Sequence, residues 1–113
     1  MDVTTETFQR DVIERSHQLP VVVDFWAQWC WPCRMLGPVL EAESKKRTGQ
    51  LELVKLDIDA EQKIAARYGI KSIPTVVAFR DGKPLTGFVG AQSRRKIARF
   101  FDRQVLTATD KPA

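Results

Sequence analysis

The sequence has only two cysteines and one histidine among its 113 residues, which leaves few ligands for a metal site. Structural zinc needs four ligands, usually in two paired sets of cysteine or histidine, so we expect no bound metal. No apolar run approaches the roughly 20 residues of a membrane span. The N-terminal MDVTTETFQR lacks the basic start and apolar middle of a secretion signal. These absences predict a cytoplasmic protein that makes no contact with a membrane.

The sequence also has little net charge, with a formal value of only +4. Much of it lies in two runs, Lys45-Lys46-Arg47 and Arg94-Arg95-Lys96. No aromatic residues interleave with these runs and no nucleic-acid-binding signature is present, so we interpret them as solvated helix faces. The length and the 43% of apolar residues are ordinary for a soluble domain. We expect one monomeric domain over residues 1–113, with a frayed tail at 107–113.

Hydrophobic periodicity predicts alternating helices and strands. Helices are expected at 6–16, 32–47, 60–68 and after Ser93, and strands at 21–27, 51–57, 75–80 and 85–89. Pro38 lies inside the second helix, whose apolar face is expected to hold Met35, Leu36, Val39 and Leu40. Asp81-Gly82 is a turn signal that pairs the last two strands as a hairpin. A β-α-β unit followed by a hairpin predicts an α/β fold with a mixed central sheet and helices on both faces.

The two cysteines lie three residues apart in WCWPC, Trp29 to Cys33, directly after the apolar strand VVVDFWA. A Cys-x-x-Cys pair at a strand-to-helix turn is typical of a redox couple. Cys30 is then at the helix N-terminus, where the helix dipole and free N–H groups lower the pKa of a thiol, and Pro32 fits the first turn. Since Cys33 lies inside the helix, we predict that Cys30 attacks a substrate disulfide and Cys33 resolves the mixed disulfide.

Other interpretations of the pair remain open at this point. A metal site would need a second chain to share ligands, because His17 has no partner at ligand spacing and is interpreted as a surface residue. Buried, unreactive cysteines are common, although two at this spacing beside Trp29 and Pro32 favour chemistry. A static disulfide is not typical of a cytoplasmic chain.

The segment VVVDFWAQWCWPC resembles the active-site segment of thioredoxins, and further motifs follow in order. They are KLDID at 55–59, YGIKSIPT at 68–75, FRDGK at 79–83 and Val89-Gly90-Ala91. The resemblance covers roughly residues 4–106 and implies the thioredoxin fold, a mixed four- to five-stranded sheet flanked by four helices. Only MDVT precedes the first helix, so the family's first strand is expected to be short or missing.

The resemblance also implies roles for residues around the cysteines. Asp24 matches the aspartate that assists proton transfer at the resolving cysteine, and its burial is expected to raise its pKa. Lys55 matches a lysine that lies near that aspartate. Ile73-Pro74 matches a segment whose proline is cis and whose backbone faces an extended substrate. Trp26 is expected to pack beneath the site, and the expected substrate groove consists of Trp29, Trp31, Pro32, Ile58, Ile73, Pro74 and Gly90.

Trp31 departs from the family, which usually has glycine at this position. Its indole adds apolar bulk at the mouth of the site and is expected to affect the reduction potential, the choice of partner or the rate of re-reduction. Arg34 stands where the family commonly has lysine or arginine, and its charge favours a thiolate. The segments IERSHQLPVVVDFW, DIDAEQKIAARYGI and DGKPLTGFVGAQ also resemble the thioredoxin-like domain of co-chaperonins that carry helical repeats.

The main functional hypothesis is a thiol-disulfide oxidoreductase that reduces protein disulfides through Cys30 and Cys33. The resemblance implies no bound cofactor, disulfide-containing proteins as partners, and re-reduction by thioredoxin reductase, an NADPH-linked flavoprotein. One alternative is a chaperone-like module that binds clients in the groove. Another alternative reverses the chemistry and makes the protein an oxidase or isomerase with a shifted potential. The missing secretion signal argues against this last hypothesis, while Trp31 leaves it open.

Overall fold

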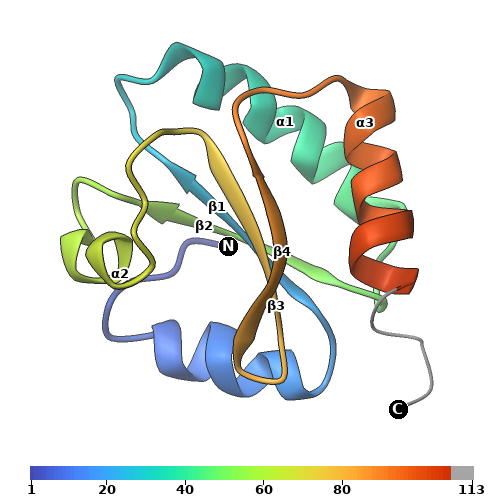
Figure 1. Ribbon diagram of the computed structural model, residues 1–113, viewed down its shortest axis with the longest axis horizontal. Helices are drawn as coiled ribbons and strands as arrows, with labels where there is room; N and C mark the ends of the chain where they lie inside the picture. Colours follow the sequence, from blue (N-terminus) through green and yellow to red (C-terminus); the bar gives the residue numbers. More distant parts are fainter. Residues whose placement is uncertain (108–113) are drawn as a thin grey trace.

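A central sheet of four strands organises the molecule, and the computed structural model describes it within residues 1–107. The strand order is β2-β1-β3-β4, with β1 parallel to β2 and antiparallel to β3, and with β3 antiparallel to β4 (Figure 1). The strands are β1 (Val21–Trp26), β2 (Glu52–Asp57), β3 (Thr75–Arg80) and β4 (Lys83–Val89). The predicted mixed sheet and its hairpin are therefore confirmed.

Helices cover both faces of this sheet, as the thioredoxin fold requires. In chain order they are η1 (Gln9–Glu14, π-helical) with η2 (Arg15–His17, a 3₁₀ turn), α1 (Trp31–Lys45), α2 (Gln62–Arg67), and α3 (Arg94–Arg99) with η3 (Phe100–Leu106, π-helical). The tail expected at 107–113 lies, apart from Thr107, outside the described residues, and Thr107 caps η3. None of the described helices is both long enough and apolar enough to serve as a membrane span.

The first strand that the family resemblance implied is present only as a single bridge. Asp2 forms an isolated parallel bridge to Lys55 on the free edge of β2. The Lys55 N–H donates to the Met1 carbonyl at 2.8 Å, and the Val3 N–H donates to the Lys55 carbonyl at 2.8 Å. The short first strand expected from the sequence is thus observed, and Val3 is buried in the core.

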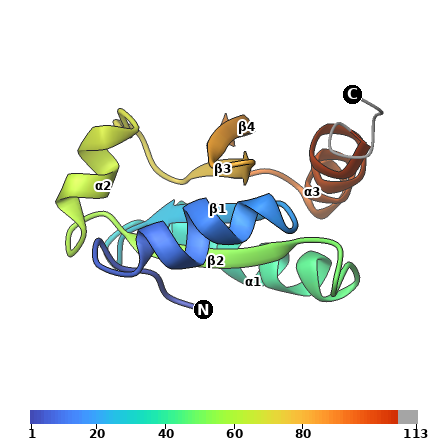
Figure 2. The same cartoon turned by 90° about the horizontal axis from the view of Figure 1, so that it is seen from below.

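Two apolar clusters fill the space between the sheet and its helices. Because side chains alternate along a strand, Val21, Val23 and Phe25 face η1 and α2, while Val22 faces α1 and α3. In Figure 1, α1 lies on one side of the strands and the blue helical segment η1 lies on the other, and in the view from below in Figure 2 η1 lies in front of part of the sheet. Asp24 follows Val22 by two residues and therefore faces the same side of the sheet. Its carboxyl group projects into the layer below α1.

The hairpin and the first helical segment are tied together by Ser16, a buried residue that sequence patterns did not reveal. Its hydroxyl donates to the Ile13 carbonyl at 2.7 Å and accepts the Gly82 N–H at 2.8 Å. Asp81 and Gly82 have φ values of 54° and 80°. These values fit the tight turn that the Asp-Gly pair predicted.

The apolar face expected for α1 is partly wrong. Leu36 and Leu40 are buried as predicted, but Met35 keeps 57% of its surface exposed. The helix turns by about 100° per residue, so Met35 points away from the sheet. The carboxylate of Glu43, three residues after Leu40, is buried on the core side of α1, which the sequence analysis did not predict. Lys46 and Arg47 satisfy that carboxylate at 3.1 and 3.2 Å.

Candidate active site

The two cysteines lie at the junction between β1 and α1. Cys30 is the N-cap of the helix, with extended backbone angles, and Trp31 and Pro32 form the first turn. The two sulfur atoms are joined in a disulfide, with the Cα atoms 5.3 Å apart. The structure therefore excludes two separate unreactive thiols and supports the redox interpretation of the pair.

The helix N-terminus acts directly on the Cys30 sulfur. The backbone N–H of Cys33 donates to Cys30 Sγ at 3.3 Å, which is the capping bond that a serine or aspartate side chain makes at other helices. After reduction this N–H and the positive end of the helix dipole stabilise negative charge on the sulfur. Pro32 has no N–H of its own to compete for the sulfur. The local geometry thus favours a thiolate at Cys30.

An apolar shell surrounds the disulfide. Cys30 and Cys33 retain 4% and 2% of their surface, and Ala27 beside them is fully buried. Trp26, Ile58 and Ile73 pack around these three residues. Trp26 therefore lies beneath the site, as expected. Two of the predicted groove residues, Ile58 and Ile73, are brought against the cysteines by the loops that follow β2 and precede β3.

The peptide bond between Ile73 and Pro74 is cis, as the family motif implied. The Pro74 carbonyl accepts the Gly90 N–H at 2.8 Å, so the loops at the ends of β3 and β4 are fixed to each other. Gly90 has a φ of 91°, a conformation that favours glycine. In the described part of the chain, Ile73 forms no backbone hydrogen bond outside the regular elements, and its N–H and carbonyl are available to a ligand.

Two indoles flank the disulfide on the surface. Trp29 and Trp31 keep 68% and 66% of their surface exposed. Trp29 is oriented by a bond that the sequence did not predict, in which its Nε1–H donates to the Asp59 carboxylate at 2.7 Å. Pro32 is also exposed. Large exposed aromatic surface next to a buried reactive group is typical of a protein-binding site.

Asp24 is a buried carboxylate without a full set of partners. It retains 1% of its surface, and its Oδ1 has no hydrogen-bond partner among the described residues. Burial raises the pKa of Asp24 from 3.8 to about 6, the Lys55 charge opposes this rise, and the Glu41 charge adds to it. A carboxyl group with a pKa near neutrality can exchange protons at physiological pH.

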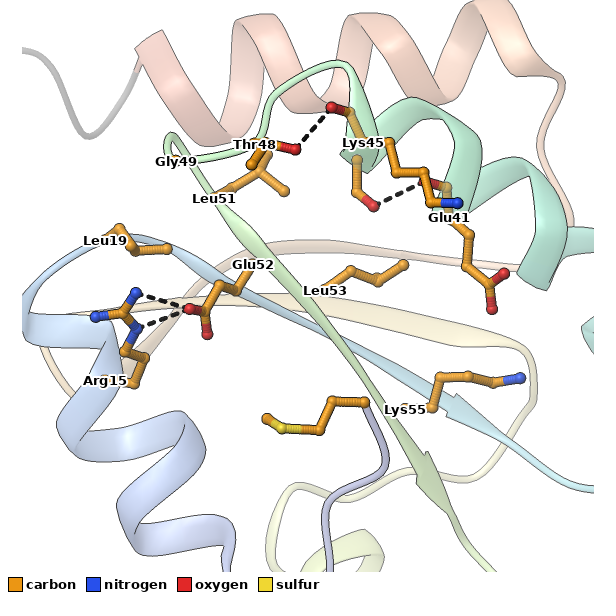
Figure 3. A pocket seen from close by; sticks show the side chains of 12 residues that line it. Arg15, Leu19, Glu41, Lys45, Thr48, Gly49, Leu51, Glu52, Leu53 and Lys55 are labelled. Atoms are coloured by element: carbon orange, nitrogen blue, oxygen red, sulfur yellow. Dashed lines mark hydrogen bonds and ion pairs between the residues drawn. The ribbon is translucent and has the colours of Figure 1, made fainter.

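Lys55 lies opposite Asp24 in the register of β1 and β2. Its ammonium group sits 4.2 Å from the centre of the Trp26 ring, a cation–π contact. Figure 3 shows Lys55 at one end of a pocket of about 540 Å³, with Glu41 directed toward it and the Arg15–Glu52 ion pair at the other end. Neither the cysteines nor Asp24 line this pocket, but the charges of Lys55 and Glu41 on its rim affect the pKa of Asp24.

Glu41 provides a test of this electrostatic arrangement. We expect Glu41→Gln to lower the pKa of Asp24, because the substitution removes a negative charge that opposes ionisation of the buried carboxyl group. Titration of the Asp24 carboxyl carbon by NMR measures the pKa. Glu6→Gln, at an exposed position on the N-terminal segment, is the control and should leave the Asp24 pKa in place. A pKa of Asp24 that rises in Glu41→Gln would contradict the arrangement.

Sequence reasoning missed two groups near the site, Asp59 and Glu41, and one buried carboxylate near the far end of α1, Glu43. No sequence signal marks Asp59, because its bond to Trp29 joins two separate loops. Glu43 follows the buried Leu36 by seven positions and Leu40 by three, so helical spacing alone could have placed it on the core face. Within residues 1–107 no cluster of three or more His, Cys, Asp or Glu side chains is arranged to hold a metal ion.

Comparison with known proteins agrees with this geometry. The family model described as Thioredoxin matches residues 1–103. The chain is 41% identical over 103 residues to Thioredoxin 1 of Synechococcus elongatus, which covers 91% of this chain and 94% of the relative. It is 40% identical over 105 residues to Thioredoxin C-2 of Corynebacterium nephridii, covering 93% and 95%. It is 39% identical over 105 residues to a thioredoxin of Pseudomonas aeruginosa, with the same coverage.

Proposed function

Since the chain belongs to the thioredoxin family and is a thiol-disulfide oxidoreductase, we propose that Cys30 is its attacking thiol and Cys33 its resolving thiol. The observation that carries this assignment is the N–H of Cys33 donating to Cys30 Sγ at the start of α1. That bond stabilises a thiolate on Cys30. Cys33 lies one turn further along the helix, and no N–H of the described residues donates to its sulfur.

The reaction consists of two exchanges between sulfur atoms. The Cys30 thiolate attacks one sulfur of a protein disulfide, a Cys30–substrate disulfide forms, and the other substrate sulfur leaves as a thiolate. The Cys33 thiolate then attacks Cys30 Sγ, the mixed disulfide breaks, and the second substrate thiolate leaves. Two electrons pass from the dithiol to the substrate, which takes up two protons. The protein ends with the Cys30–Cys33 disulfide observed in the structure.

Asp24 and Lys55 are proposed to serve the second exchange. Cys33 must lose its proton before it attacks, and a buried carboxylate with a pKa of about 6 is a suitable acceptor at neutral pH. Lys55 stands beside Asp24 in the strand register and supports the ionised form by its charge. Asp24 is buried below α1, the helix that carries Cys33, and this placement supports its role.

The substrate groove is proposed to be formed by the loops around the disulfide. Trp29, Trp31 and Pro32 offer exposed surface, and Ile58 packs against the cysteines. The free backbone groups of Ile73, with Pro74 and Gly90 fixed beside them, suit an extended segment of a substrate protein. The groove therefore accepts protein disulfides in preference to small ones.

Reducing equivalents are proposed to come from NADPH through a flavoprotein, thioredoxin reductase, with no cofactor bound to the chain itself. We further propose that the protein is a monomer of one domain, that it acts in the cytoplasm, and that it binds neither nucleic acid nor membranes. The likeness to the co-chaperonin domains stays a prediction. A second candidate function is the binding of unfolded clients without redox chemistry, and the exposure of Trp29 and Trp31 favours it.

A coupled assay tests the proposed function. Insulin is mixed with the chain, NADPH and a bacterial thioredoxin reductase, and NADPH oxidation is followed by absorbance. We expect steady NADPH consumption that scales with the concentration of the chain. A parallel assay replaces NADPH and the reductase by dithiothreitol and measures the precipitation of reduced insulin. Failure of the first assay alone would contradict the reductase partner, and failure of both would contradict disulfide reduction.

A further inference from the structure

A second apolar stripe runs along the outer side of α1. Trp31, Met35, Pro38 and Ala42 are all exposed, and their spacing of four, three and four residues aligns them on one face of a helix. The core-facing residues of α1 include Leu36, Leu40 and Glu43, which lie on the opposite side. No described residue covers the stripe, although most surface helices present polar residues to solvent.

The stripe begins at the reactive centre. Trp31 follows Cys30 directly, and Met35 stands one turn behind it. Any protein whose disulfide reaches Cys30 must place the surrounding part of its surface over Trp31. Ala42 lies about 16 Å further along the helix axis, at about 1.5 Å per residue. The stripe therefore extends along α1 well beyond the residues that surround the cysteines.

Positive charge borders the stripe. Arg34 and Lys45 each follow a stripe residue by three positions, and neither forms an ion pair with a described residue within 4.0 Å. Glu41 shares this border, but Figure 3 shows its carboxylate directed toward Lys55 across the pocket. On the other border, Lys46 is paired with Glu43 at 3.1 Å. Arg34 and Lys45 are thus unpaired cations beside the stripe, whereas Glu41, which also forms no ion pair among those described, directs its carboxylate away from the stripe toward Lys55.

We propose that the outer face of α1 is a docking surface for the protein that carries the substrate disulfide. It selects substrates that present apolar residues flanked by carboxylates next to that disulfide. The proposal rests on the proposed function, because it specifies the substrate class of the same site. A second copy of the chain is a poor occupant of this surface. Two such faces in contact would bring the unpaired Arg34 and Lys45 side chains of both copies together, and these like charges repel.

Three synthetic peptides test the proposal. The loop peptide contains only a short ring closed by a disulfide. The acidic peptide continues that ring into an amphipathic helix of about 14 residues, enough to span the stripe, with leucines at heptad spacing and glutamates beside them. The basic peptide has lysines in place of the glutamates. The rate constant kcat/KM is measured for each peptide with the full chain and dithiothreitol as reductant.

We expect the acidic peptide to be reduced about tenfold more efficiently than the loop peptide, and the basic peptide no better than the loop peptide. A tenfold ratio corresponds to about 1.4 kcal/mol of additional binding. Equal rates for all three peptides would overturn the proposal, because the stripe would then make no contact with substrates. A preference for the basic peptide would overturn its charge assignment.

The substitution Ala42→Glu tests the contribution of the stripe at a position far from the cysteines. Each rate is divided by that of the loop peptide with the same variant, so that any effect on the dithiol itself cancels. We expect Ala42→Glu to remove the preference for the acidic peptide and Ala42→Lys to keep it. Ala66→Glu, at an exposed position on α2, is the matched control and should keep the preference as well. Equal loss in Ala42→Glu and Ala66→Glu would overturn the proposal in favour of a general charge effect.

Two further measurements separate the remaining outcomes. Sedimentation of the wild type and of Ala42→Glu reports self-association. A wild-type dimer that Ala42→Glu dissociates would overturn the proposal, because a second copy would then cover the stripe.

Tryptophan fluorescence measures the affinity for peptides in which serine replaces cysteine. If no peptide is reduced, the proposed function fails. Tighter binding of the acidic serine peptide would still support the docking surface, and equal binding would reject it.

Discussion

Cys30→Ser is expected to reduce protein-disulfide turnover by about 10³-fold or more, to the background of uncatalysed exchange. Serine keeps the size of the side chain and the capping bond from the Cys33 N–H, but its hydroxyl is not ionised at neutral pH and does not attack disulfides. The fold should survive, since serine is a favourable N-cap residue. Insulin reduction with dithiothreitol and far-UV circular dichroism measure activity and folding.

Cys33→Ser is the matched variant, because it removes the other sulfur of the same pair. It should retain the first exchange and lose the second, so that a covalent Cys30–substrate disulfide accumulates. Mass spectrometry without reducing agent detects this species as a one-to-one adduct. Multiple turnovers in Cys33→Ser, or an adduct that forms on Cys33 when Cys30 is replaced, would reverse the proposed roles.

The same pair of variants separates the enzyme from a client-binding module. Binding of unfolded clients to the exposed surface of Trp29 and Trp31 does not need a thiolate. A module of that kind would suppress client aggregation equally well as wild type and as Cys30→Ser, without a change in the clients' disulfides. The oxidoreductase instead loses its effect on disulfide-bonded substrates when Cys30 is replaced.

Asp24→Asn is expected to stabilise the fold by about 2 to 3 kcal/mol at pH 7.5. Burial raises the pKa of Asp24 from 3.8 to about 6, and a shift of this size corresponds to about 3 kcal/mol of differential stability between its two protonation states. Asparagine has nearly the same shape as the neutral acid and carries no charge that must be buried. Urea unfolding of the oxidised protein measures the free energy of unfolding.

The sign of the pH dependence follows from proton binding. Between pH 4 and pH 6 the folded protein keeps a proton on Asp24 that the unfolded chain has already released. The free energy of unfolding therefore falls as pH rises through this window, by up to about 1.4 kcal/mol per pH unit from this one group. The stabilisation by Asp24→Asn should vanish below about pH 4, where Asp24 is protonated in both states, and become constant above about pH 7.

Glu6→Gln is again the control, because it neutralises a carboxylate that is exposed and should change the free energy of unfolding by less than about 0.5 kcal/mol. Destabilisation by Asp24→Asn at pH 7.5, or a difference from wild type that does not depend on pH, would contradict the charge burial described here. The same variant should slow resolution of the mixed disulfide at neutral pH, since Cys33 loses its proposed proton acceptor.

The chemical centre was accessible from sequence because its signals are local. A cysteine at a strand end, proline in the next turn and an apolar helical pattern specify the N-cap geometry of Cys30 without knowledge of the rest of the chain. The mixed sheet and its hairpin followed from strand periodicity and the Asp81-Gly82 turn for the same reason. The cis bond before Pro74 followed from the family resemblance alone, because the sequence pattern itself does not determine the isomer.

Features that depend on contacts between distant segments could not be predicted. Trp29 is oriented by Asp59, and the pKa of Asp24 is affected by Glu41. These pairs come from different elements and have no common sequence spacing. The exposed position of Met35 was missed for another reason. In α1 both sides of the helix carry apolar residues, and periodicity cannot tell which of two apolar faces meets the sheet.

The reduction potential of the Cys30–Cys33 couple tests the central claim most directly. The oxidised chain is equilibrated with mixtures of reduced and oxidised dithiothreitol, and the fraction of dithiol is read from tryptophan fluorescence. A reductant of protein disulfides should show a reversible two-electron couple near the value of about −270 mV that is typical of thioredoxins, within the cytosolic range of about −220 to −320 mV. A potential near −120 mV, typical of a strong oxidant, would contradict the account and identify an oxidase or isomerase.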